Sequence, residues 1–352
     1  MPALLRRSRF ALPLFILVPL HLAGCTAGVA PTTTPTQISA TIPAAADTVL
    51  VPTDFWSTRG GNSYELYSMG GAVPTRLTYC LGCQATGVAP SLERNRIALR
   101  RANSDSNGDG KFDDFDASTL LLVDLARQIE GPFLPEGWNT SSVDWSSDGT
   151  TLVHTSSPDG SPDDIYAMDN NGANNRRLTG TPTVRERGAR LNAAITRVVY
   201  ERIDGVAAGK SEIWVFLSNT NQQRLTDSGV SGGAQLPGTY YLVGSDAGPD
   251  YSPDAANVVF RRLTSTSVAG GTWDILVVPA AGGAPSVLAS GPQFRSNPDW
   301  SNEGIVFTEQ NLTSGGMDVV VINPATGARR VLQSLPSGYR AGSPRWIAGI
   351  AG

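Results

Sequence analysis

The sequence predicts an all-β fold, a six-bladed β-propeller built of four-stranded antiparallel blades. The main observation is a recurring phrase of aspartate, an aromatic residue and serine, found at Asp144–Ser146, Asp250–Ser252 and Asp299–Ser301. A truncated copy ends in Trp346, close to the C-terminus. A phrase repeated at intervals of roughly fifty residues indicates an array of one small structural unit.

The segments after each phrase supply the strands of a blade. After Trp145, three short runs rich in β-branched and apolar residues follow in order, and Gly, Pro, Asn and Asp separate them. Such runs between turn residues are typical of β-strands. The same order follows the other aromatic copies, and two weaker copies align on leucines. The residues at the aromatic position, called anchors below, are then Leu92, Trp145, Leu191, Tyr251, Trp300 and Trp346.

The two ends of the array complement each other. No strand pattern follows Trp346, whereas the strand patterns at 48–51, 64–69 and 75–78 have no anchor before them. We therefore expect Ser343–Ile347 to supply the first strand of the first blade. This C-terminal strand joins the N-terminal blade and closes the ring, which occupies residues 47–352.

The segment Val143–Gly180 resembles the repeat of TolB-type propellers, also described as WD40-like or PD40 repeats. The resemblance extends over roughly residues 48–350 and implies a propeller that contacts another protein through one face or mouth. TolB carries an α/β domain ahead of its propeller, and no such domain is expected here. The same repeat occurs in the propellers of prolyl-oligopeptidase-type peptidases, so it predicts fold better than function.

The N-terminus has the pattern of a lipoprotein signal. Three arginines precede an apolar run of about thirteen residues, which is too short to span a bilayer. The sequence Leu-Ala-Gly-Cys that ends at Cys25 resembles the lipobox of bacterial lipoproteins, which implies a signal peptide over residues 1–24 and lipid attachment to Cys25. Residues 25–46, rich in Ala, Thr and Pro, then form a flexible tether. The alternative is an ordinary signal peptide with a chance cysteine.

These features predict an extracytoplasmic protein that is held at the cell envelope by a lipid anchor in the membrane. It faces the periplasm from the outer membrane where the cell has one, and otherwise lies on the outer face of the cytoplasmic membrane. Removal of the signal, with its three arginines, changes the formal net charge from −4 to −7. We expect no nucleic-acid partner, because phosphate contacts need basic surfaces.

One loop has the spacing of a calcium site. Calcium takes six to eight oxygen ligands, and alternate residues around a tight turn can converge on one ion. The core of the motif resembles the calcium hairpins of integrin-type propeller blades, and Asp116 is then a bystander. A solvated acidic turn is the alternative. The predicted ligands of this structural site are Asp105, Asn107, Asp109, the carbonyl of Lys111, and Asp113.

Cys80 and Cys83 are the cysteines that remain beyond Cys25. A C-x-x-C pair can serve redox chemistry or half of a zinc site. The mature chain has no second such pair and only one histidine, so a four-ligand zinc site lacks donors. We expect a small disulfide between Cys80 and Cys83 in an oxidising compartment.

The sequence favours a binding protein over an enzyme. A catalytic triad would depend wholly on His154, which lies in a predicted strand, and no Gly-x-Ser-x-Gly motif occurs. The recurrence of Asp144, Asp250 and Asp299 in successive repeats indicates that they bind strand or turn donors as scaffold. The alternative is a hydrolase or carbohydrate-binding protein that uses the central cavity.

The longest insertion between repeats runs from Ser228 to Gly248. It carries Tyr240 and Tyr241 in a glycine-rich context, and apolar loop residues often mark contacts with partners. We expect these tyrosines to bind a protein partner. The alternative is that they fold onto the ring.

Overall fold

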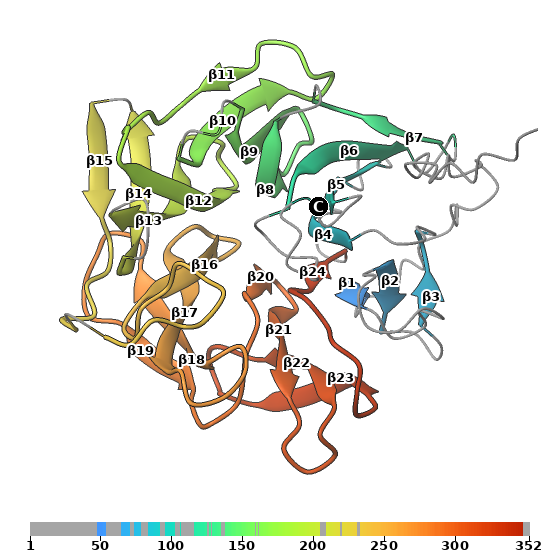
Figure 1. Cartoon of the computed structure of the whole chain (residues 1–352), viewed down its shortest axis with the longest axis vertical. Coiled ribbons are helices and arrows are strands. Elements are labelled where there is room, and N and C mark those ends of the chain that lie inside the picture. The colour runs from blue at the N-terminus through green and yellow to red at the C-terminus, as the bar shows by residue number, and fades with distance from the viewer. Residues whose placement is uncertain are drawn as a thin grey trace, which may run out of the picture. The chain divides into compact units, whose positions relative to one another are not determined.

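The protein is described by a computed structural model, shown in Figure 1. The structure describes residues 48–53, 65–70, 74–78, 84–91, 96–102, 106, 116–124, 127, 129–134, 138–158, 160, 162–204, 209–218, 220–230 and 233–347.

The strands form six four-stranded antiparallel sheets arranged as the blades of a propeller (Figure 1). No helix occurs among the described residues. Blade one contains β24 (Arg345–Trp346), β1 (Val49–Thr53), β2 (Glu65–Met69) and β3 (Thr75–Arg76). Blade two contains β4 (Gln84–Ser91), β5 (Arg96–Ala102), β6 (Ser118–Asp124) and β7 (Ile129–Pro132). Blade three contains β8 (Asn139–Trp145), β9 (Thr151–Ser157), β10 (Asp164–Asp169) and β11 (Arg176–Arg177).

The other three blades repeat this order. Blade four contains β12 (Val184–Leu191), β13 (Val198–Asp204), β14 (Ser211–Ser218) and β15 (Asn221–Arg224). Blade five contains β16 (Asp246–Tyr251), β17 (Asn257–Ser265), β18 (Thr272–Pro279) and β19 (Ser286–Ala289). Blade six contains β20 (Asp299–Ser301), β21 (Gly304–Gln310), β22 (Met317–Ile322) and β23 (Arg329–Leu335). The predicted fold class and blade composition are confirmed.

The ring closes where the sequence predicts. Strand β24 pairs with β1, with Trp346 opposite Val49 and Arg345 opposite Leu50. The amide of Ile347 extends the pairing by donating to the carbonyl of Thr48 at 3.0 Å. The last segment of the chain therefore provides the innermost strand of the first blade, as Figure 1 shows beside β1.

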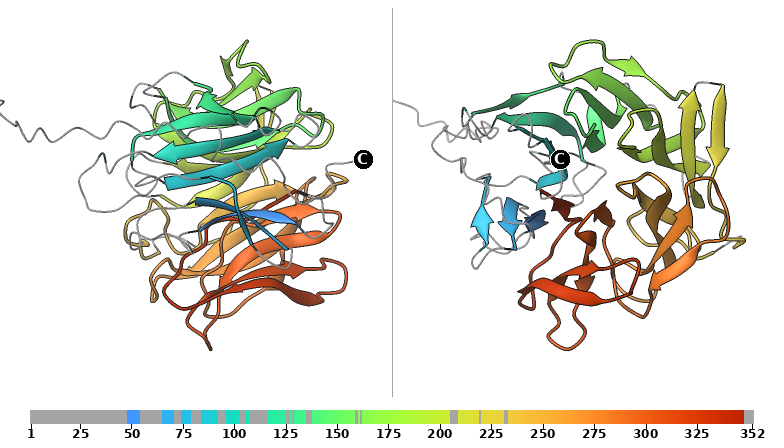
Figure 2. Two further views of the ribbon diagram at one scale, coloured as in Figure 1. Left: turned by 90° about the vertical axis from the view of Figure 1, so that its right-hand side faces the viewer. Right: turned by 180° about the vertical axis from the view of Figure 1, so that it is seen from behind.

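The anchors pack between neighbouring blades. Trp145 of blade three lies in one cluster with Ala98 and Leu120 of blade two, and Trp346 lies in another with Val306 and Val319 of blade six. Figure 2 shows the sheets stacked against one another in the view turned by 90°, and these clusters lie between neighbouring sheets. Burying such apolar side chains is the main force that holds one blade against the next.

One predicted anchor was wrong. In blade three Trp145 pairs with Leu152, and the equivalent pair in blade two is Pro90 with Ile97. The anchor of blade two is therefore Pro90 and not Leu92, because β4 ends at Ser91. Proline is tolerated there since the inner edge of an innermost strand faces the axis and needs no ladder donor on that side.

Within the described part of the chain, no helix is long and apolar enough to cross a membrane.

Candidate functional site

The residue just before each anchor faces the axis of the ring. Because one innermost strand from each blade runs along the axis, these residues meet in the middle. They form what we call the axial ring, which comprises Ala89, Asp144, Arg190, Asp250, Asp299 and Arg345. The ring thus brings three carboxyl groups and two guanidinium groups together in a largely buried setting.

Each axial aspartate joins its blade to the next anchor. The Oδ2 atom of Asp144 accepts the amide of Leu191 at 3.0 Å, and that of Asp250 accepts the amide of Trp300 at 2.7 Å. Asp299 accepts the amide of Trp346 at 2.7 Å, which fastens the closing strand. The interpretation of the recurring aspartates as scaffold is confirmed by these three bonds.

The two arginines replace aspartate in the repeat. Arg345 donates through Nη2 to Asp144 Oδ1, and its Nε lies 3.1 Å from Asp299 Oδ1. Arg190 donates through Nη1 to the carbonyl oxygens of Val143 and Ala189, at 3.4 and 3.1 Å. The charges of the ring are therefore partly neutralised within it.

Burial sets the protonation of this ring. Burial, reinforced by the nearby Asp299 carboxylate, raises the pKa of Asp250 to about 8. Burial and the positive charge of Arg345 lower the pKa of Arg190. For Arg345, burial works against the charged form, but the three carboxylates outweigh it and raise the pKa. The Asp250 carboxyl group therefore holds its proton more readily than a free aspartate does.

A cavity of about 470 Å³ opens on the side where the innermost strands end. We call it the anchor-side cavity. The serines and asparagines of the turns after the anchors form its rim, and the axial carboxyl groups form its floor. Its apolar walls are Pro90, Trp145, Leu191, Tyr251, Trp300 and Trp346. Aromatic walls with a few polar groups are typical of a ligand or peptide site.

A second cavity, of about 350 Å³, lies on the side where the innermost strands begin. We call it the arginine cavity, because Arg187, Arg190, Arg261 and Arg345 line it. Glycines allow the backbone to bend there. Gly248 has a φ of 59°, and a Cβ on it would lie 2.3 Å from the Asn297 side chain. Arg345 borders both cavities, so the axial ring separates them.

The insertion of residues 228–248 forms part of the wall of the arginine cavity. The hydroxyl of Tyr241 donates to Glu201 Oε2 at 2.7 Å, and its ring lies edge-on to Trp273 at 5.5 Å. Tyr240 instead lies under the guanidinium of Arg185, at 4.2 Å from its ring centroid. Tyr241 therefore folds onto the ring, and Tyr240 lies against a cation.

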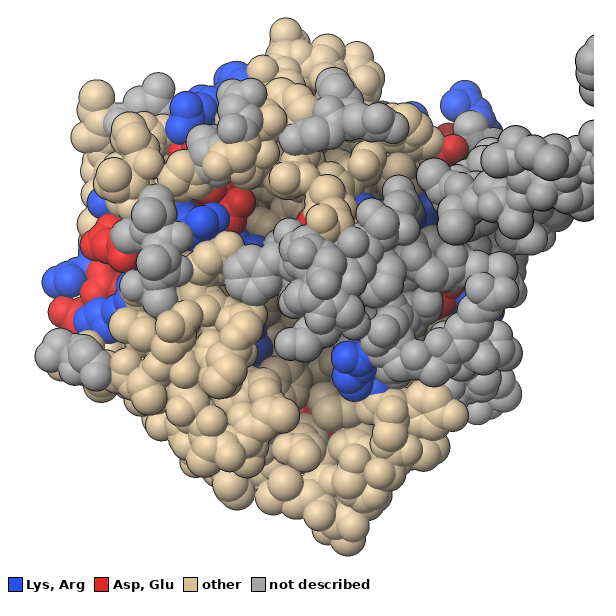
Figure 3. Space-filling model, in the orientation of Figure 1, with Lys and Arg blue, Asp and Glu red and all other residues tan. Residues whose placement is uncertain are grey.

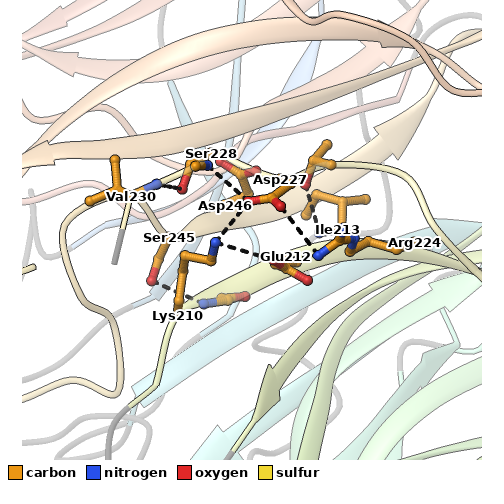
Figure 4. A network of polar contacts seen from close by, with 12 residues as sticks. Lys210, Glu212, Ile213, Arg224, Asp227, Ser228, Val230, Ser245 and Asp246 are labelled. Carbon is orange, nitrogen blue, oxygen red and sulfur yellow. Dashed lines mark hydrogen bonds and ion pairs between the residues drawn. The ribbon is translucent and has the colours of Figure 1, made fainter. Parts of the chain in front are cut away.

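A charged network lies beside the two ends of this insertion, and Figure 4 draws it together with Ser228, Val230, Ser245 and Asp246. Lys210 Nζ donates to Asp227 at 2.8 Å and lies 3.3 Å from Glu212, and Arg224 bridges the same two carboxylates. Lys210 and the amide of Gly229 lower the pKa of Asp227 to about 2. Figure 3 shows acidic and basic side chains intermixed on the left of the face drawn, where Figure 1 places β14 and β15.

His154 lies in β9, as predicted. Its side chain is fully buried, with Nδ1 2.8 Å from Ser156 Oγ and Nε2 3.0 Å from Asn175 Oδ1. The ring stacks on Tyr166 at 5.3 Å, and burial lowers the pKa of His154 to about 4. This histidine is neutral and packed within a blade, away from the axial ring.

Several predicted site residues lie outside the described residues. They are Cys25, Cys80, Cys83, Asp105, Asn107, Asp109, Lys111 and Asp113. Two neighbours of the predicted calcium loop are described. The amide of Ser106 donates to Asp116 Oδ1 at 2.7 Å, and Asp116 is buried. Asp116 therefore ties the two ends of the loop together, and calcium binding stays a prediction.

Sequence reasoning missed Arg190 and Arg345 as members of the site. The signal was present in the repeat alignment, because these residues precede the anchors Leu191 and Trp346. The recurring pattern was defined by aspartate at this position, so the two repeats that carry arginine there did not match it. The Asp-to-Arg replacements give the axis its distinct charge pattern.

No family model matches the chain, and no curated protein matches it. Solved structures do match. TolB from Acinetobacter baumannii aligns with a TM-score of 0.63 and 15% identity, over 86% of this chain and 67% of that chain. A putative TolB from Agrobacterium tumefaciens aligns with a TM-score of 0.56 and 15% identity, over 86% of this chain and 99% of that chain. A chain from a nidogen/laminin complex aligns with a TM-score of 0.58 and 11% identity, over 85% of this chain and 97% of that chain. The chain has the fold of TolB-type six-bladed propellers, as predicted.

Proposed function

We propose that the protein is a non-catalytic, extracytoplasmic scaffold, held to the membrane through a lipid on Cys25, that binds another protein or an envelope component. The anchor-side cavity carries the proposal. Its aromatic walls and its rim of serine and asparagine suit an extended segment of a partner. The TolB-like fold supports a scaffold role, and one fold neighbour comes from a complex of two proteins, nidogen and laminin.

The chemistry of the floor argues for binding. The Oδ2 atoms of Asp144, Asp250 and Asp299 are occupied by backbone amides of the next blades. A carboxylate that holds the ring together is not free to move a proton without loosening the fold. The buried His154 does not line this cavity, and both of its ring nitrogens have hydrogen-bond partners inside blade three.

A crosslinking pull-down from intact envelopes tests the proposal. Asn302 is exposed at the rim of the anchor-side cavity, and Asn302→Arg adds a bulky charge without touching the core. Tyr240→Ala tests the insertion as a second contact, and Thr326→Arg, in the exposed β22–β23 turn, is the matched control. We expect one dominant protein whose recovery falls with Asn302→Arg or Tyr240→Ala and not with the control. Equal recovery from all variants contradicts the proposal.

One observation favours a second candidate, a hydrolase or a carbohydrate-binding protein. Asp250 has a pKa near 8 and shares a cavity with Asp299 and four aromatic side chains. A carboxyl group of raised pKa with a second carboxyl group nearby is a feature of glycosidases, and aromatic rings stack on sugars. Turnover of a glycoside that disappears in Asp250→Asn would favour this candidate over the scaffold.

A further inference from the structure

The arginine cavity has a charge that the scaffold role does not explain. Arg187, Arg190, Arg261 and Arg345 line it, and among the described lining residues Glu201 is the one carboxylate. The axial aspartates line the other cavity. The axis is therefore polarised, because the three axial aspartates line the anchor-side cavity, Arg190 lines the arginine cavity, and Arg345 lines both.

Buried guanidinium donors of two arginines that line this cavity lack a hydrogen-bond partner among the described residues. Arg190 is 9% exposed, and both of its hydrogen bonds run through Nη1, to Val143 and Ala189. Its Nε and the Nη1 of Arg345 are buried without a hydrogen-bond partner among the described residues. A guanidinium group has five donors and no acceptor, and leaving buried donors unpaired is unfavourable.

Both oxygens of the carboxylate on the cavity wall already accept a hydrogen bond. Glu201 accepts the hydroxyl of Tyr241 through Oε2 and the amide of Gly248 through Oε1, both at 2.7 Å. Arg187 and Arg261 are held elsewhere. Arg187 Nε lies 3.0 Å from Asp163, and Arg261 donates to a backbone carbonyl at 2.9 Å. These two arginines add positive charge, whereas Arg190 and Arg345 offer donors.

Part of the lining of the cavity is apolar. Leu236 and Trp273 are almost fully buried and pack with Phe294 and Tyr241 in one cluster. The guanidinium of Arg261 lies 3.9 Å from the Trp273 ring centroid, which fixes the indole. A volume of about 350 Å³ that is lined by both guanidinium donors and aromatic side chains suits one small amphipathic ligand.

We propose that the arginine cavity binds a small organic carboxylate. The carboxylate group accepts from Arg190 and Arg345, and the apolar body of the ligand packs against Trp273 and Phe294. Guanidinium groups recognise carboxylates through short charge-assisted bonds, and burial strengthens them. The insertion of residues 228–248 then serves to close the site, since Leu236 and Tyr241 come from it.

Titration calorimetry with phenylacetate tests this proposal, with the neutral analogue phenylacetamide and the truncated anion acetate as controls. We expect one phenylacetate per chain and much weaker binding of both controls. Arg190→Gln should weaken phenylacetate binding by about thirtyfold, because it removes one member of a buried charge pair. Arg127→Gln, at an exposed arginine that lies 3.6 Å from Asp124 in blade two and does not line the cavity, should leave binding unchanged.

Absence of binding at millimolar phenylacetate, or equal binding of phenylacetamide, overturns the proposal. Unchanged affinity in Arg190→Gln does so as well. If that variant fails to fold by circular dichroism, Arg190→Lys retains the charge but lacks the planar fork, and weaker binding is again expected. A short peptide ending in phenylalanine presents the same carboxylate from a protein, and its affinity relative to phenylacetate distinguishes a partner's C-terminus from a free acid.

Discussion

Replacing Asp299 with alanine removes two buried contacts from the strand that closes the ring. The Oδ2 atom of Asp299 accepts the amide of Trp346 at 2.7 Å, and its Oδ1 lies 3.1 Å from Arg345 Nε. A buried amide left without an acceptor costs about 1–3 kcal/mol. Removing one partner of a buried ion pair costs about 3–5 kcal/mol. Because Arg345 keeps Asp144 as a partner, we expect a total loss of about 3–5 kcal/mol in the free energy of unfolding.

Urea unfolding followed by tryptophan fluorescence measures this loss. Asp299→Asn retains an oxygen that can accept the Trp346 amide, so it should fall between the wild type and Asp299→Ala. Asp254→Ala is the matched control, because this exposed turn carboxylate accepts local hydrogen bonds from Ser252 Oγ and the Ala256 amide and does not link two blades. The control should cost about 1 kcal/mol or less. A loss below about 1 kcal/mol for Asp299→Ala refutes the role of the axial aspartates as links between blades.

Four other side chains can be tested individually. His154 has a pKa near 4 in the folded chain, against an ordinary value of 6.5. As the pH drops from 6.5 to 4 the unfolded chain therefore binds the proton first, and the free energy of unfolding should fall. His154→Gln should remove this pH dependence. Asp250 has a folded pKa near 8 against 3.8, so the folded chain keeps its proton longer and stability should fall as pH rises from 4 to 8. Asp250→Asn should flatten that limb of the pH–stability curve, and an unchanged curve contradicts the assignment. Calcium titration should give a heat that Asp109→Ala abolishes, and no heat in the wild type at millimolar calcium rules out the site. Cys25→Ser should move the protein from the membrane to the soluble fraction, whereas unchanged membrane retention excludes this anchor.

The fold could be predicted from the sequence because every blade has the same order of strands and packs against its neighbours in the same way. A large side chain fills the space between two sheets in most blades, so Trp145, Tyr251 and Trp300 remain recognisable even where the rest of the repeat diverges. Blade two was harder, since Pro90 fills the same place with a smaller ring and without an aromatic signal. A sequence pattern defined by aromatic anchors therefore assigns the anchor of blade two to Leu92, which is two residues too late in the chain.

The site was accessible only in part. Recurrence identified Asp144, Asp250 and Asp299 as scaffold, but it could not show that Arg190 and Arg345 meet them on the axis. That contact depends on the ring bringing blades one, three and four together, as in the ion pair between Arg345 and Asp144, 201 residues apart. The long-range burial that raises the pKa of Asp250 is likewise a property of the closed ring.

Site-specific photo-crosslinking in intact envelopes tests the central proposal most directly. A photoreactive residue at Asn302 lies on the rim of the anchor-side cavity, and one at Thr326 lies in an exposed turn of the same blade. We predict a single crosslinked protein partner from position 302, abolished by adding Asp299→Ala, and none from position 326. Equal crosslinking from both positions, or none from position 302, would contradict the assignment of this cavity as the partner site.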